Sequence, residues 1–113
     1  MRHFTTLDTM EHIKAFIQGH PLVLLYFSQP NCSVCHGLQP QIAQLMGQYP
    51  DIQMGHINTH KVQAVAGQFS IFTVPVILLF VDGKEYLREA RIVQLQRFDE
   101  KIHNIYINVA DSE

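Results

Sequence analysis

The sequence predicts an α/β protein with a mixed central β-sheet and helices on both faces. Two almost unbroken apolar runs, Leu22–Ser28 and Val76–Val81, have the length and composition of strands that are buried on both sides. Segments with an apolar residue at every third or fourth position alternate with these runs and indicate helices. The pair Asp82-Gly83 after the second run is a strong hairpin signal, which adds an antiparallel strand. The predicted order of elements is therefore αβαβαββα.

The chain has the size and composition of one globular domain, which we place over residues 1–113. Of its 113 residues, 47% are hydrophobic and 16% are charged, and there is no low-complexity stretch. The net charge is −2, and the basic residues are scattered along the chain rather than clustered. This charge pattern argues against a nucleic-acid partner and against a polybasic membrane-binding surface.

The apolar segments are too short for a membrane span or a secretion signal. The longest run, Val74–Val81, is far below the roughly 20 residues that cross a bilayer as a helix. Residues Met1–His12 contain no apolar core and no small-residue cleavage site, so no secretory signal is predicted. We therefore expect a cytoplasmic protein, and in that reducing compartment two cysteines are not expected to form a purely structural disulfide.

The first helix is expected over Thr5–Gln18. Its apolar face has the spacing of an amphipathic helix and consists of Leu7, Met10, Ile13, Phe16 and Ile17. Asp8 and Glu11 have the spacing of a capping box at its start. Gly19 followed by Pro21 ends it.

A second helix is expected over Asn31–Tyr49. Its apolar stripe repeats at intervals of three and four residues and consists of Val34, Leu38, Ile42, Leu45 and Tyr49. Pro40 interrupts this helix, because proline deletes one backbone hydrogen bond and clashes with the carbonyl of the preceding turn. We therefore predict a kink just past the turn that carries the cysteines.

The remaining elements are a strand, a short helix, a second strand and a last helix. We expect the strand over Ile52–Asn58 and the short helix over Lys61–Phe69. Glu85–Arg91 should pair antiparallel with the apolar run that precedes the hairpin. The last helix is expected over about Val93–Asn108, and its apolar face consists of Leu95, Phe98, Ile102, Ile105 and Val109.

Cys32 and Cys35 are the only cysteines of the sequence and stand where a buried strand turns into the second helix. A C-x-x-C pair in this position indicates a redox-active dithiol. Asn31 is a favourable N-cap residue, so the Cys32 thiol is expected at the positive end of the helix dipole. Such surroundings lower a cysteine pKa from about 8.5 to roughly 3.5–7.5, which makes the sulfur nucleophilic near neutral pH. We assign Cys32 as the attacking cysteine and Cys35, one helical turn on, as the resolving cysteine.

Three other interpretations of these cysteines fit the sequence less well. Two inert buried thiols are disfavoured by the polar neighbours Asn31, Ser33 and His36. His36 completes the string C-x-x-C-H, the attachment motif of c-type haem, but long apolar strands and the lack of an export signal argue against a haem protein. A zinc site that includes His56 and His60 has the spacing of no standard zinc finger.

The chain resembles the thioredoxin family over nearly its whole length. The resemblance rests on the N-terminal helix, a buried strand, C-x-x-C at a helix start, Pro40 within that helix, and Phe69–Pro75 before the next strand. In that family the proline matching Pro75 has a cis peptide bond and packs beside the cysteines. The backbone of the preceding residue, Val74 here, pairs with the bound substrate segment. An exposed backbone edge of this kind binds an extended peptide by strand addition.

The sequence departs from the family pattern around the cysteines. Ser33-Val34 stands in place of the usual Gly-Pro dipeptide, and Asn31 in place of the usual tryptophan. A glycine that keeps the substrate groove open falls at about Arg91. The resemblance therefore implies the fold and the redox centre, whereas these changes bear on the reduction potential and the partner.

Two further departures fall on the residues that move a proton at the second cysteine. Tyr26 stands where the family has a buried aspartate, and His56 where it has a lysine. Tyrosine has a pKa near 10 and is a poor base at neutral pH, whereas a histidine pKa is near 6.5. We hypothesise a proton relay in which His56 partly replaces the missing carboxylate, with Tyr26 as the other candidate. The alternatives are a structural histidine bonded to a neighbour and a tyrosine that only fills the core.

Together these observations predict a thiol–disulfide oxidoreductase with a thioredoxin-like fold that reduces protein disulfides. Cys32 and Cys35 are the predicted catalytic residues, Val74 and Pro75 the predicted substrate platform, and no metal or cofactor is predicted. Electrons would come from a reductase or a low-molecular-weight thiol. The alternative is a non-enzymatic thioredoxin-fold binding module, in which the groove around Val74, Pro75 and Arg91 recognises a partner and the cysteines are a redox switch or vestigial.

Overall fold

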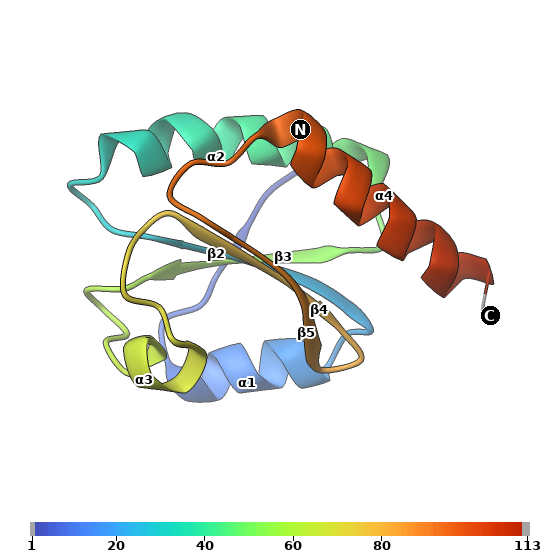
Figure 1. Cartoon of the computed structure of the whole chain (residues 1–113). Helices are drawn as coiled ribbons and strands as arrows, with labels where there is room; N and C mark the ends of the chain where they lie inside the picture. Colours follow the sequence, from blue (N-terminus) through green and yellow to red (C-terminus); the bar gives the residue numbers. More distant parts are fainter. Residues whose placement is uncertain (1, 112–113) are drawn as a thin grey trace.

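The computed structural model describes residues 2–111, and within them five strands form a mixed sheet with helices on both faces (Figure 1). The strands are β1 Thr5–Thr6, β2 Leu22–Ser28, β3 Gln53–Asn58, β4 Val76–Val81 and β5 Lys84–Ala90. Their spatial order is β1-β3-β2-β4-β5. β3 pairs in parallel with β1 and β2, whereas β4 pairs antiparallel with β2 and β5. The predicted mixed sheet is confirmed.

The helices lie in two layers, one on each face of the sheet. They are α1 Met10–Gln18, α2 Ser33–Leu45, α3 Val65–Phe69 and α4 Leu95–Asp111, with a 3-10 turn, η1 Met46–Gln48, after α2. Figure 1 shows α2 and α4 above the sheet and α1 and α3 below it. None of the helices within residues 2–111 is long and apolar enough to cross a membrane.

The core is divided into two clusters because β2 and β4 are buried on both faces. Successive side chains of a strand point to opposite sides, so an unbroken apolar run fills both layers at once. From β2, Leu24 and Tyr26 pack on the α2 and α4 side, whereas Leu25 and Phe27 pack on the α1 and α3 side. Every residue of β2 is buried, which is the arrangement that its composition predicts.

The N-terminal segment differs from the predicted helix over Thr5–Gln18. Thr5 and Thr6 form β1, which pairs with Gly55 and His56 of β3, and the helix begins only at Met10. β-branched threonines favour extended backbone, and β3 supplies the partner edge. The helix is capped by Thr9, whose hydroxyl accepts a hydrogen bond from the His12 amide at 3.0 Å. The predicted capping box of Asp8 and Glu11 is therefore wrong.

The second helix is shorter than the predicted Asn31–Tyr49 and carries a different stripe. It spans Ser33–Leu45, with Pro40 inside it, and its buried residues are Cys35, Leu38, Ile42 and Ala43. Val34 was expected in the stripe, but it lies in the first turn of the helix and is 60% exposed. Val34 therefore lies on the surface between the two cysteines.

The C-terminal half follows the predicted pattern closely. Asp82 and Gly83 both have positive φ, 50° and 82°, as a two-residue hairpin turn of type I′ requires, and they join β4 to β5. α3 is shorter than the predicted Lys61–Phe69 helix and begins at Val65. Phe98 and Ile102 of α4 are fully buried against the sheet, as their spacing predicts.

Candidate active site

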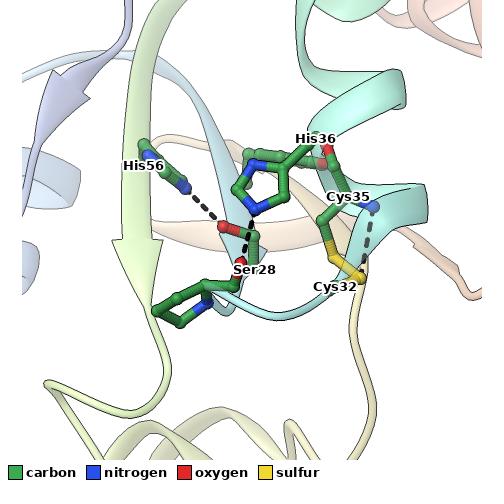
Figure 2. The surroundings of a disulfide bond; sticks show 7 residues. Ser28, Cys32, Cys35, His36 and His56 are labelled. Atoms are coloured by element: carbon green, nitrogen blue, oxygen red, sulfur yellow. Dashed lines mark hydrogen bonds between the residues drawn. A yellow bond between two sulfur atoms is a disulfide. The ribbon is translucent and has the colours of Figure 1, made fainter.

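The two cysteines lie at the N-terminus of α2 and form a disulfide with a Cα–Cα distance of 5.3 Å (Figure 2). Cys32 precedes the helix and is partly exposed, whereas Cys35 lies in the first turn and is fully buried. Cys32 is therefore the more accessible residue of the pair. The difference arises because Cys32 caps the helix end with extended backbone, whereas Cys35 lies on the buried face of α2 together with Leu38 and Ile42.

The N-cap of α2 is Cys32 and not Asn31 as predicted. The Cys35 amide donates a hydrogen bond to the Cys32 sulfur at 3.2 Å. Asn31 belongs instead to the preceding turn, in which the Cys32 amide donates to the Gln29 carbonyl at 3.2 Å. The Cys32 sulfur itself therefore accepts an amide of the first helical turn, at the positive end of the helix dipole.

The Val74–Pro75 peptide bond is cis, as the resemblance implies. Phe27 of β2 is paired with Val76 of β4, so Pro75 leaves the sheet at the same end as the loop that carries the cysteines. The Pro75 carbonyl accepts a hydrogen bond from the Arg91 amide at 2.8 Å. The backbone groups of Val74 take part in no hydrogen bond within residues 2–111. Its amide and carbonyl are thus available to a peptide laid alongside.

Exposed apolar side chains occur in the segments around this peptide bond. Phe72, two residues before Val74, is 78% exposed, and Ile92, next to Arg91, is 84% exposed. Arg91 has a positive φ of 65°, the backbone region that favours glycine. Arginine stands here where the family pattern has a glycine, and its side chain lies on the surface.

Tyr26 and His56 are adjacent, as the register of β2 and β3 pairs them directly. Their ring centroids are 5.8 Å apart. The Tyr26 hydroxyl donates a hydrogen bond to the Cys35 carbonyl at 2.6 Å, inside the core. Burial raises the pKa of Tyr26 to about 12, so the phenol stays protonated at neutral pH. Tyr26 therefore contacts the backbone of Cys35 as a hydrogen-bond donor.

His56 makes its hydrogen bond with Ser28, a residue that the sequence reasoning missed. Ser28 Oγ and His56 Nε2 are 2.5 Å apart (Figure 2). Burial, and in second place the nearby His36, lowers the pKa of His56, so its imidazole is neutral at pH 7. The signal for Ser28 was its polarity at the end of an otherwise apolar strand, two residues after Tyr26 and hence on the same sheet face.

A cleft of about 360 Å³ opens beside this pair, between the N-terminal segment and α2. Its lining includes Arg2, His3, His36 and His56, and no acidic side chain. His36 is fixed through its Nε2, which donates to the Pro30 carbonyl at 2.7 Å. Within residues 2–111 no group of three or more His, Cys, Asp or Glu side chains is arranged to hold a metal ion.

Comparisons with known proteins agree with this geometry. Residues 4–105 match the family model described as Thioredoxin. The chain is 45% identical to the thioredoxin-like protein YdfQ of Bacillus subtilis, over 94% of this chain and 95% of that protein. It is 32% identical to a thioredoxin of Chlamydia caviae, over 84% of this chain and 89% of that one. The X-ray structure of Fasciola hepatica thioredoxin superposes with a TM-score of 0.81 at 19% identity, covering 89% and 98% of the two chains.

A mixed sheet with a cysteine pair at a helix N-terminus defines a thioredoxin-fold redox protein, and the chain belongs to the thioredoxin family. Family membership and the adjacent cysteine pair make it a thiol–disulfide oxidoreductase.

Proposed function

We propose that this protein reduces disulfide bonds of protein substrates, with Cys32 as the attacking cysteine and Cys35 as the resolving cysteine. The observation that carries this assignment is the asymmetry of the pair: Cys32 is partly exposed at the helix N-terminus, and Cys35 is fully buried. Only an exposed thiolate can approach a disulfide on another protein. The hydrogen bond from the Cys35 amide to the Cys32 sulfur supports the same assignment, because it favours the charged form of the sulfur.

The reaction consists of two exchanges of sulfur bonds. The Cys32 thiolate attacks one sulfur of the substrate disulfide, forms a mixed disulfide and releases the other substrate sulfur as a thiolate. Cys35 then loses its proton and attacks the Cys32 sulfur, which forms the Cys32–Cys35 disulfide and releases the second substrate thiolate. Two electrons pass from the dithiol to the substrate. The disulfide seen between Cys32 and Cys35 is the oxidised end state of this cycle.

The substrate segment is proposed to lie in extended form along Val74, with Pro75 beneath it. The free amide and carbonyl of Val74 support this placement. They can form strand-like hydrogen bonds with the backbone of the segment that holds the substrate cysteine. The exposed side chains of Val34, Phe72 and Ile92 favour protein partners that present apolar residues next to the disulfide.

We place the reaction in the cytoplasm, with a reductase or a low-molecular-weight thiol returning electrons to the Cys32–Cys35 disulfide. In that compartment, thiols are kept reduced, so a dithiol of low potential acts as a donor. The direction of electron transfer follows from the difference between the reduction potential of the protein and that of the compartment.

The test is the equilibrium of the protein with glutathione buffers, with the free thiols counted by alkylation. We expect a midpoint potential below the cytosolic glutathione poise of about −220 to −260 mV. Cys35→Ser is the matched control, because it forms only a mixed disulfide with glutathione and sets the signal for that species. A midpoint well above the poise would reverse the proposed direction. A cysteine pair that stays reduced in every buffer would instead favour a binding module.

A further inference from the structure

Ser28 is the one polar side chain, apart from the tyrosines, that is buried within residues 2–111, with 4% of its surface exposed. Ser28 is the last residue of β2, just before the loop to Cys32, and its hydroxyl forms a hydrogen bond with His56 Nε2. Ser28 shares a sheet face with Tyr26, whose hydroxyl reaches the Cys35 carbonyl. Cys35 is buried in the core cluster on that face. A buried hydroxyl therefore lies on the sheet face that faces the resolving cysteine.

His56 connects this hydroxyl to the solvent. Its ring lies against Tyr26 on one side and at 6.1 Å from the Phe4 ring, and it lines the cleft beside α2. A proton that reaches His56 can thus leave through the cleft without crossing the core.

We propose that the Ser28–His56 pair takes up the proton that Cys35 releases when it attacks the mixed disulfide, which is the second step of the function proposed above. As the Cys35 thiol loses its proton to Ser28 Oγ through one water molecule, the Ser28 hydroxyl passes its own proton to His56 Nε2. The Cys35 thiolate then attacks Cys32. The net change is one proton moved from Cys35 to His56, which later loses it to the cleft.

The groups around His56 keep its imidazole neutral before the transfer, so that its Nε2 is free of a proton and can accept one. Arg2 and His3 from the N-terminal segment and His36 from α2 face the same cleft, and Tyr26 is its neighbour on β2. None of these groups is acidic, and no acidic side chain lines the cleft. His56 therefore enters the reaction neutral, with a pKa that burial and His36 keep below its ordinary value. Tyr26 cannot take this part, because its phenol is protonated and already donates to the Cys35 carbonyl.

The experiment measures the two exchange steps separately with a chromogenic aromatic disulfide, 5,5′-dithiobis(2-nitrobenzoate), supplied below the protein concentration. Attack by Cys32 releases one coloured thiolate, and resolution by Cys35 releases the second in a first-order phase. Both phases are recorded in a stopped-flow instrument between pH 5 and 8 for the wild type, His56→Gln and Ser28→Ala. His3→Gln is the matched control, since it removes another imidazole from the same cleft without touching Ser28.

In the wild type, the second phase should slow as the pH falls through the lowered His56 pKa, because protonated imidazole accepts no proton. In His56→Gln and Ser28→Ala it should be about tenfold slower or more at pH 7, with no histidine step in the profile, while the first phase keeps its rate. His3→Gln should match the wild type. In His56→Ala, added imidazole should restore the second phase alone, a rescue that lost packing would not give.

Three results would overturn the relay. A second phase with the wild-type rate and pH profile in His56→Gln is one, and equal slowing by His3→Gln is another. The third is the absence of rescue in His56→Ala. A wild-type protein that shows no first phase would overturn the proposed reductase function itself, so the two failures are distinguishable.

Discussion

Tyr26→Phe tests whether the tyrosine beside the cysteines has a structural role or a chemical one. The change removes only the hydroxyl that donates to the Cys35 carbonyl at 2.6 Å in the fully buried core. A neutral hydrogen bond of this kind contributes about 0.5–1.5 kcal/mol to stability. The ring itself stays packed between Phe4 and His56, with centroids at 5.7 and 5.8 Å, so no cavity term is added.

We expect a loss of about 1 kcal/mol, since the Cys35 carbonyl can still accept the amide of the next helical turn. Urea unfolding of the oxidised protein, with the m value held common to both proteins, measures this difference. The pH profile of mixed-disulfide resolution should stay unchanged, because burial raises the Tyr26 pKa to about 12, far from the working range. A loss above about 3 kcal/mol, or a shifted pH profile, would refute the assignment of Tyr26 as a purely structural donor.

Three further predictions concern the sheet, the loop before Pro75 and the pH dependence of stability. Gly55→Ala places a Cβ at 2.5 Å from Leu7 Cδ1 in the core, so overpacking should lower the unfolding free energy by about 1–3 kcal/mol in urea, and an unchanged midpoint would contradict the close contact. Arg88→Gln removes hydrogen bonds of 2.8 and 3.2 Å to the carbonyls that end α3, so KM for a protein disulfide should rise at constant kcat, and an unchanged KM would argue against this support of the loop. His56→Gln should lose less stability than the wild type between pH 7 and pH 5: burial lowers the folded pKa of His56, so the unfolded wild-type chain gains a proton first as the pH falls below about 6.5. If the urea midpoint of the wild type and that of His56→Gln fell by the same amount from pH 7 to pH 5, the sign would be contradicted.

The strands that the sequence predicts best are those whose signal is local. Leu22–Ser28 and Val76–Val81 coincide with β2 and β4, because a strand buried on both faces must be apolar throughout. β1 could not be predicted in this way. Thr5 and Thr6 are extended because they pair with Gly55 and His56, about 50 residues further along the chain, and a two-residue strand has no periodicity to detect.

The same distinction holds at the site. Cys32 and Cys35 were predicted from their spacing, but the capping residue was not, because Asn31 and Cys32 are both compatible with a helix start and only the turn geometry decides. The contact between Ser28 and His56 depends on the register of β2 and β3, and no local pattern in the sequence records that register.

The central claim, that Cys32 attacks and Cys35 resolves, is tested most directly by trapping. Cys35→Ser and Cys32→Ser are each mixed in reduced form with a small protein that contains one disulfide, alkylated, and analysed by intact mass. Cys35→Ser should accumulate a covalent complex through Cys32. Cys32→Ser should form none, because its remaining thiol is fully buried in the folded protein. A complex that forms equally well with Cys32→Ser, or with neither variant, would contradict the account.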